Sequence, residues 1–247
     1  MGYLKIDGKD TRIYVQTGMQ TKPDDALKNA QALSQILGEP VGAIVNSTQG
    51  LGKDIEEYLP KAPSLKDALN EYTYQVLNAQ GDKLVVLHSA GNEDAKKALQ
   101  LGQSLGHQYG SLSFVSLGSP LSNSVMRHSV TQPGATYLGQ VNDWRDPVTH
   151  PALWVAGTAT MAVGGLVAGV ALAPATGGGS LYAYGAALMG GGVGGGVGGG
   201  VGGGAIVYGL NNYHPFDKYI TKPQAQSILF DWAKKNPQPK SWVTGAP

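Results

Sequence analysis

The chain has 247 residues, of which 42% are hydrophobic and 14% charged, so it can bury a substantial core but is short for two full domains. Its 18 basic and 17 acidic side chains leave a formal charge of +1 without a clustered basic stripe, which argues against nucleic acid as a partner. The absence of cysteine excludes disulfides, thiolate metal sites and a cysteine nucleophile.

Up to about residue 146, strand-like and helix-like patterns alternate along the chain. The strand-like runs are short and apolar, and the helix-like segments carry apolar side chains on one face. The predicted strands are 13–16, 41–45, 84–87, 112–117 and 136–141. The predicted helices are 23–37, 64–76, 92–105 and 224–234. This alternation predicts an α/β fold with a mostly parallel central sheet and helices on both of its faces.

The pentapeptide Leu87-His88-Ser89-Ala90-Gly91 directly follows a predicted strand and precedes a predicted helix. A serine among small residues at such a junction is the sequence form of a nucleophile elbow, in which a strained turn exposes the hydroxyl. Asp146 and His214 follow it, and Ser, Asp, His is the chain order of α/β-hydrolase triads. Because a serine nucleophile needs a base and an acid that orients the base, we predict Ser89 as nucleophile, His214 as base and Asp146 as acid.

Asp143, three residues before Asp146, is the alternative acid. The predicted donors to the oxyanion are the N–H of Ala90 and the N–H of Met19 or Gly18, which follow the first of the predicted strands.

The other four histidines fit the role of base less well. His88 adjoins Ser89 in sequence and is expected to point elsewhere, whereas His150 comes too soon after Asp146 to serve it. His107 and His128 are expected on surface turns. We predict no metal and no cofactor, because His-Glu-x-x-His and phosphate-binding glycine motifs are both missing from the sequence.

Seventy residues, 147–216, contain no Asp, Glu, Lys or Arg. Within them, 152–173 is a 22-residue apolar stretch, long enough as a helix to cross a bilayer core of roughly 30 Å. Residues 190–204 comprise twelve glycines and three valines, at 193, 197 and 201. This four-residue period suits close helix packing in lipid. We therefore expect an apolar, Gly-rich lid or membrane-docking hairpin rather than a linker, which is normally richer in serine and other polar residues.

The segments Tyr14–Thr21, Ile44–Gly50 and Leu87–Gly91 together resemble the α/β-hydrolase lipase domains of bacterial polymorphic toxins and type VI secretion effectors. The resemblance covers roughly residues 12–150 and resumes at His214. It implies a Ser-Asp-His esterase that acts on membrane phospholipids, often against a competing bacterium, and that is blocked by a cognate immunity protein. The family's nucleophile, acid, base and early oxyanion loop match Ser89, Asp146, His214 and Gly18 with Met19.

The chain departs from this family in two places. Leu87 stands where the elbow has its first glycine, and its bulk is expected to crowd the turn. The Gly-rich insertion has no counterpart that we can match in the family.

The prediction is therefore an α/β-hydrolase-like core, 1–150, an apolar insertion, 151–210, and a C-terminal part, 211–247, that completes the core. The predicted activity is that of a serine lipase or phospholipase at a membrane surface. Because no secretory signal opens the sequence, export without a signal peptide or within a larger carrier is expected, with action at the periplasmic face of a target cell. The alternatives are a glycine-zipper toxin or anchor that inserts into membranes, and a soluble carboxylesterase for small esters.

Overall fold

The computed structural model describes residues 2–5, 11–18, 21–45, 81–106, 108–146, 148–149 and 214–237. In these parts of the chain, strands and helices alternate as the sequence predicts. In chain order the elements are β1 (Gly2–Lys5), β2 (Ile13–Gln16), α1 (Pro23–Leu37), β3 (Val41–Val45), β4 (Lys83–His88), α4 (Gly91–Ser104), β5 (Leu112–Leu117), α5 (Asn123–Ser129), β6 (Ala135–Val141), α10 (Phe216–Ile220) and α11 (Pro223–Lys235).

The six strands form one sheet in the order β1-β3-β2-β4-β5-β6. The five strands from β2 to β6 are parallel, and β1 joins the sheet by antiparallel pairing with β3. Since β2 is followed by its neighbour β3 on one side and β4 then pairs on the other side, the chain changes direction across the sheet between β2 and β4. Open parallel sheets bind ligands at the carboxyl ends of the strands beside such a switch point.

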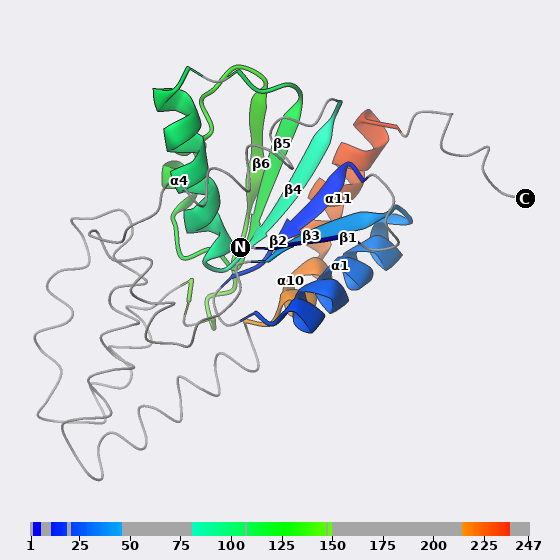
Figure 1. The fold of residues 1–247 in the computed structure, drawn as a ribbon. Helices are drawn as coiled ribbons and strands as arrows, with labels where there is room; N and C mark the ends of the chain where they lie inside the picture. Colours follow the sequence, from blue (N-terminus) through cyan, green and yellow to red (C-terminus); the bar gives the residue numbers. More distant parts are fainter. Residues whose placement is uncertain are drawn as a thin grey trace, which may run out of the picture.

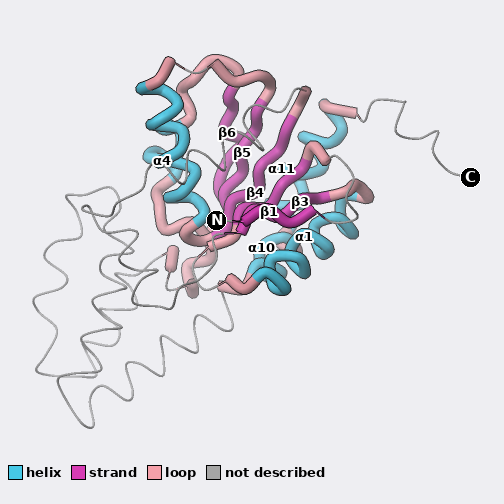
Figure 2. Tube along the Cα trace, viewed as in Figure 1, coloured by secondary structure: helices cyan, strands magenta, loops and turns pink. Residues whose placement is uncertain are grey.

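Helices cover both faces of the sheet (Figures 1 and 2). On one face, α1, α10 and α11 bury residues such as Leu33, Phe216 and Leu229 against the strands. On the other face, α4 and α5 pack residues such as Leu99 and Met126 against the opposite side of the same strands. The predicted α/β class with a parallel sheet and helices on both faces is therefore confirmed.

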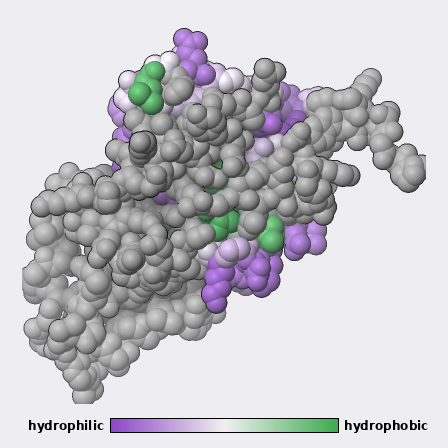
Figure 3. All heavy atoms as spheres, viewed as in Figure 1, coloured by the Kyte–Doolittle hydropathy of each residue, from purple (hydrophilic) through white to green (hydrophobic). Residues whose placement is uncertain are grey.

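Local sequence explains where these elements lie. The core of β4, Leu-Val-Val-Leu, is buried on both sides, as expected for a strand inside a covered parallel sheet. Helix α1 begins with Pro23 and ends at Gly38, whose φ of +67° is a left-handed conformation that glycine adopts without a steric penalty. Its outer surface is mostly hydrophilic, as the space-filling view shows (Figure 3).

Three short elements had no counterpart in the sequence prediction, namely β1, α5 and α10. Each has four to seven residues, too few for a hydrophobic period to be recognised. His128, expected on a turn, is exposed but lies in α5. The predicted helix at 64–76, His107, His150 and the insertion at 151–210 lie outside the described residues.

In the part of the chain that the structure describes, no helix combines the length and apolar character needed to span a bilayer. The candidate span at 152–173 lies outside that part.

Candidate active site

The predicted site residues come from one edge of the sheet. Gly18 follows β2, Ser89 follows β4, and Asp146 lies on the loop after β6. Because these strands are parallel, their carboxyl ends lie at the same edge. His214 reaches this region from the segment that leads into α10. The switch point between β2 and β4 lies between Gly18 and Ser89, where a ligand site is expected.

Ser89 occupies a strained turn between β4 and α4. Its φ is +55°, and it is the only residue other than glycine with a positive φ among those described. Such backbone costs about 1–3 kcal/mol and persists where surrounding contacts enforce it. Here the Ser89 N–H donates to the Leu117 carbonyl at 3.2 Å, and the Ser89 carbonyl accepts from the Asn92 side chain at 2.9 Å. The structure therefore places Ser89 in a strained turn between a strand and a helix, at the position where the sequence predicts a nucleophile elbow.

Glycines allow the backbone to approach this turn closely. A Cβ on Gly18 would lie 2.5 Å from Ser89 Cβ, 2.8 Å from Ser89 Oγ and 2.9 Å from the Ala90 nitrogen. A Cβ on Gly91 would lie 2.7 Å from the Gln16 carbonyl oxygen. Gly18 thus borders both the serine hydroxyl and the Ala90 N–H, the first predicted oxyanion donor. Met19, the alternative second donor, lies outside the described residues.

Contrary to the expectation from the sequence, Leu87 does not crowd the elbow. Its side chain is fully buried in the core on the α4 face of the sheet, in a cluster that includes Ala95 and Ala98. Since successive side chains of a strand point to opposite faces, Leu87 and His88 lie on different sides of the sheet.

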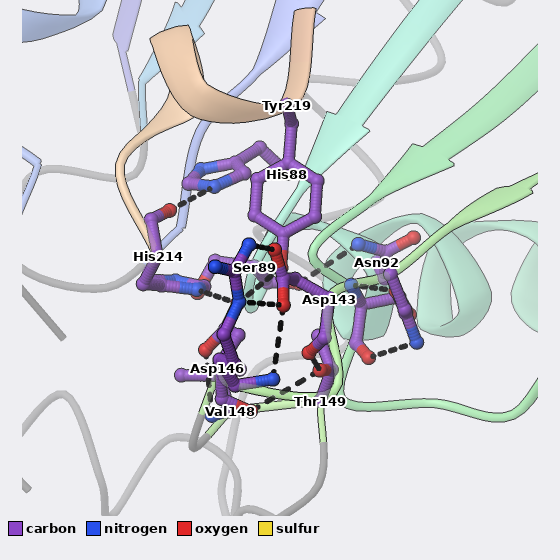
Figure 4. A network of polar contacts seen from close by, with 12 residues as sticks. His88, Ser89, Asn92, Asp143, Asp146, Val148, Thr149, His214 and Tyr219 are labelled. Carbon is purple, nitrogen blue, oxygen red and sulfur yellow. Dashed lines mark hydrogen bonds and ion pairs between the residues drawn. The ribbon is translucent and has the colours of Figure 1, made fainter. Parts of the chain in front are cut away.

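Asp146 is fully buried and receives three hydrogen bonds. The Val148 N–H donates to Oδ1 at 2.8 Å, and the Tyr219 hydroxyl donates to Oδ2 at 2.5 Å. His214 Nδ1 lies 2.7 Å from the same Oδ2, so a proton on Nδ1 points at the carboxylate and leaves Nε2 as the basic nitrogen. Figure 4 shows Tyr219 projecting from α10 toward Asp146, with His214 beside it. The structure thus brings together the predicted acid and base.

Asp143, the alternative acid, is occupied by cations. Arg145 donates to both of its oxygens, and Lys222 Nζ lies 2.8 Å from Oδ2. The Arg145 hydrogen bonds and the Lys222 ammonium hold the pKa of Asp143 well below its usual value, although burial opposes this shift. The link to Lys222 ties the loop to the junction between α10 and α11. Asp143 therefore has a structural position, and Asp146 is the carboxylate that meets a histidine.

His88 contacts His214 and two aromatic side chains of α10, Phe216 and Tyr219. Its Nε2 lies 2.9 Å from the His214 carbonyl oxygen, and the two rings stack with centroids 4.8 Å apart. Burial and the neighbouring His214 lower the pKa of His88 well below its usual value, so the ring is neutral at pH 7. A neutral ring with its proton on Nε2 donates to the His214 carbonyl. His88 thereby anchors the main chain of the predicted base.

The hydroxyl of Ser89 is not hydrogen-bonded to the His214 imidazole, nor to any other side chain of the described residues. Catalytic hydrogen bonds are often long without substrate and tighten when it binds. The described residues also contain no group of three His, Cys, Asp or Glu side chains placed to hold a metal ion.

Sequence reasoning missed two members of this network, His88 and Tyr219. The available signal for Tyr219 was its place five residues after His214, in a Pro-Phe-Asp-Lys-Tyr run that forms the short helix α10. No pattern in the sequence revealed that its hydroxyl meets Asp146, 73 residues away.

Comparison of the chain with models of known protein families, with curated proteins and with solved structures found no match.

Proposed function

We propose that this chain is a serine esterase of the α/β-hydrolase type that hydrolyses acyl esters of membrane phospholipids. The observation that carries the proposal is the convergence at one sheet edge of a strained serine turn and a buried, hydrogen-bonded Asp146–His214 pair. Strained backbone at a nucleophile and a histidine oriented by a carboxylate are the parts that acyl transfer to water requires.

In the proposed mechanism, Ser89 Oγ attacks the ester carbonyl while His214 Nε2 takes the hydroxyl proton. Asp146 holds the imidazole in the required tautomer and stabilises the imidazolium that forms. The tetrahedral oxyanion accepts the Ala90 N–H and a second N–H from the loop at Gly18 and Met19. Collapse breaks the ester bond, and the departing alcohol takes the proton from His214. Water, deprotonated by His214, then attacks the acyl-serine and releases the fatty acid and free Ser89.

Two features of the sequence support lipid as the substrate. The 70 residues between Asp146 and Asp217 carry no charged side chain and include the apolar stretch 152–173, and the resemblance to bacterial lipase effectors points to phospholipids. We extend the proposal to an antibacterial effector that acts at the periplasmic membrane of a target cell and is neutralised by an immunity protein.

Vesicles of phosphatidylethanolamine and phosphatidylglycerol provide the test. We expect the purified chain to release fatty acid and lysophospholipid, measured by mass spectrometry, and S89A to release neither. S124A, at an exposed serine of α5, is the matched control and retains activity. If S89A hydrolysed lipid at the wild-type rate, the proposal would be overturned. Hydrolysis of short soluble esters alone, again dependent on Ser89, would support the smaller-substrate alternative.

The Gly-rich run with valines four residues apart favours a second candidate function, insertion into membranes. Leakage of a dye from the same vesicles separates the two. If insertion is the activity, leakage persists in S89A and disappears when residues 181–204 are deleted. If lipid hydrolysis is the activity, leakage disappears in S89A.

A further inference from the structure

The carboxylate of Asp146 has more partners than an orienting acid needs. Oδ2 receives both His214 Nδ1 and the Tyr219 hydroxyl, while Oδ1 is occupied by the Val148 N–H. Asp146 and Tyr219 are both fully buried, and the His214 side chain is 15% exposed. Burial disfavours a carboxylate anion, and each hydrogen-bond donor offsets part of that desolvation cost.

Packing fixes the direction of the Tyr219 ring. The ring lies against Gly118, where a Cβ would be 2.8 Å from Tyr219 Cε2, and its centroid is 5.9 Å from that of His88. Gly118 itself has a φ of +56°, at the end of β5. The end of β5 and the β4 histidine therefore hold the hydroxyl on Asp146.

The Tyr219 hydroxyl is a permanent donor. Burial raises its pKa far above the usual value, and the Asp146 charge and the hydrogen bond to it raise the pKa further. The nearby cations Arg145 and Lys222 are bound to Asp143, and His88 is neutral. These groups therefore do not compete with Tyr219 as donors to Asp146. Of the described side chains, Tyr219 and His214 are the two that donate to this carboxylate.

We propose that Tyr219 is a positioning residue of the proposed esterase: its hydroxyl fixes the plane of the Asp146 carboxylate and directs the second lone pair of Oδ2 at His214 Nδ1. This inference depends on the proposed function for its catalytic consequence. The hydrogen bonds from Tyr219 and His214 to Asp146 are independent of the proposed function.

The variant Y219F removes the hydroxyl and keeps the ring. Because Y219F loses a hydrogen bond to a charged carboxylate, we expect kcat for ester hydrolysis to fall about 10–100-fold with KM unchanged. In the D146N background, Y219F should cause no further loss, because the group through which it acts is gone. Y137F is the matched control: Tyr137 is also buried, but on β6 and in the core of the opposite face. If Tyr219 only filled the core, Y219F would keep the ring that fills it, and kcat would stay as unchanged as in Y137F.

Two measurements separate failure of this inference from failure of the proposed function. The first is the rate at which a fluorophosphonate phosphonylates Ser89, which needs no natural substrate. We expect a fall of about 10–100-fold in Y219F and none in Y137F. The second is the low-field proton NMR resonance of His214 Nδ1–H, which requires no reaction. Because the Tyr219 hydroxyl directs Oδ2 at His214 Nδ1, its removal weakens this bond, and the resonance moves upfield in Y219F alone.

Equal phosphonylation rates and an unmoved resonance in Y219F would overturn the role of Tyr219, whatever the substrate. Absence of any labelling of wild-type Ser89 would overturn the proposed function, and the resonance alone would then decide whether Tyr219 shares Asp146 with His214.

Discussion

The two halves of the candidate site, the Ser89 turn and the Asp146 loop, are held in place by different forces. Close backbone packing surrounds the turn, where neither Gly18 nor Gly91 has room for a Cβ, and the hydrogen bonds there involve only the main chain of Ser89. Hydrogen bonds fix the loop, where both oxygens of Asp146 are occupied. The serine hydroxyl, in contrast, is bonded to no other described side chain. The candidate acid is therefore held by three hydrogen bonds, whereas no described side chain holds the hydroxyl of the candidate nucleophile.

The largest effect is expected from breaking the hydrogen-bonded half. D146N replaces an acceptor oxygen by an amide that cannot accept from His214 Nδ1 or Tyr219 in the same way, and kcat should fall by about 10³–10⁴-fold. D143N, three residues away on the same loop, removes a carboxylate that contacts Arg145 and Lys222 instead, and kcat should change by less than about tenfold. Steady-state kinetics on a soluble ester measure both. Equal losses in the two variants would end the distinction between the carboxylates.

Breaking the sterically fixed half should have the next largest effect. G18A places a methyl group 2.5 Å from Ser89 Cβ and 2.9 Å from the Ala90 nitrogen, so the oxyanion region must distort. We expect a loss of about 10²–10³-fold in kcat, comparable to removing one oxyanion donor. G38A is the matched control: its Cβ meets nothing within 4 Å, but its φ of +67° strains alanine. It should lower the free energy of unfolding by about 1 kcal/mol and leave kcat unchanged.

The smallest effect concerns stability in acid. The pKa of Asp143 is lowered mainly by the Arg145 hydrogen bonds, so its ion pairs stabilise the fold fully above its unfolded pKa near 4. This stabilisation is lost as the pH falls from there toward the depressed folded pKa. Measured by denaturant unfolding between pH 7 and pH 2, the free energy of unfolding of the wild type should therefore fall more steeply with pH below about pH 4. The same series with D143N should be flatter in that window, and parallel curves would contradict the assignment.

Sequence alone predicted the periodic parts of the fold and missed the short ones. Strands such as β4 and helices such as α1 carry long hydrophobic patterns and terminal Pro or Gly signals, so both were located to within a residue or two. Helix α10 has five residues and no period of its own, because its position depends on burying Phe216 and Ile220 against a sheet formed elsewhere.

The site shows the same division. Ser89, Asp146 and His214 could be proposed from the sequence because their chain order and the strand before Ser89 are visible there. The choice between Asp143 and Asp146 was not, because it depends on which carboxylate faces α10 and which faces Arg145 and Lys222. His88 and Tyr219 join the site through contacts between residues more than 70 positions apart, which no local pattern reports.

The central claim is that Ser89 is a nucleophile activated by the His214–Asp146 pair. The most direct measurement is to treat the full chain with a fluorophosphonate and map the adduct by peptide mass spectrometry. We expect displacement of fluoride by Ser89 Oγ, one adduct per chain on the peptide that contains Ser89, and labelling slowed strongly in D146N but not in D143N. An unlabelled Ser89, or labelling that proceeds equally in both variants, would contradict the account.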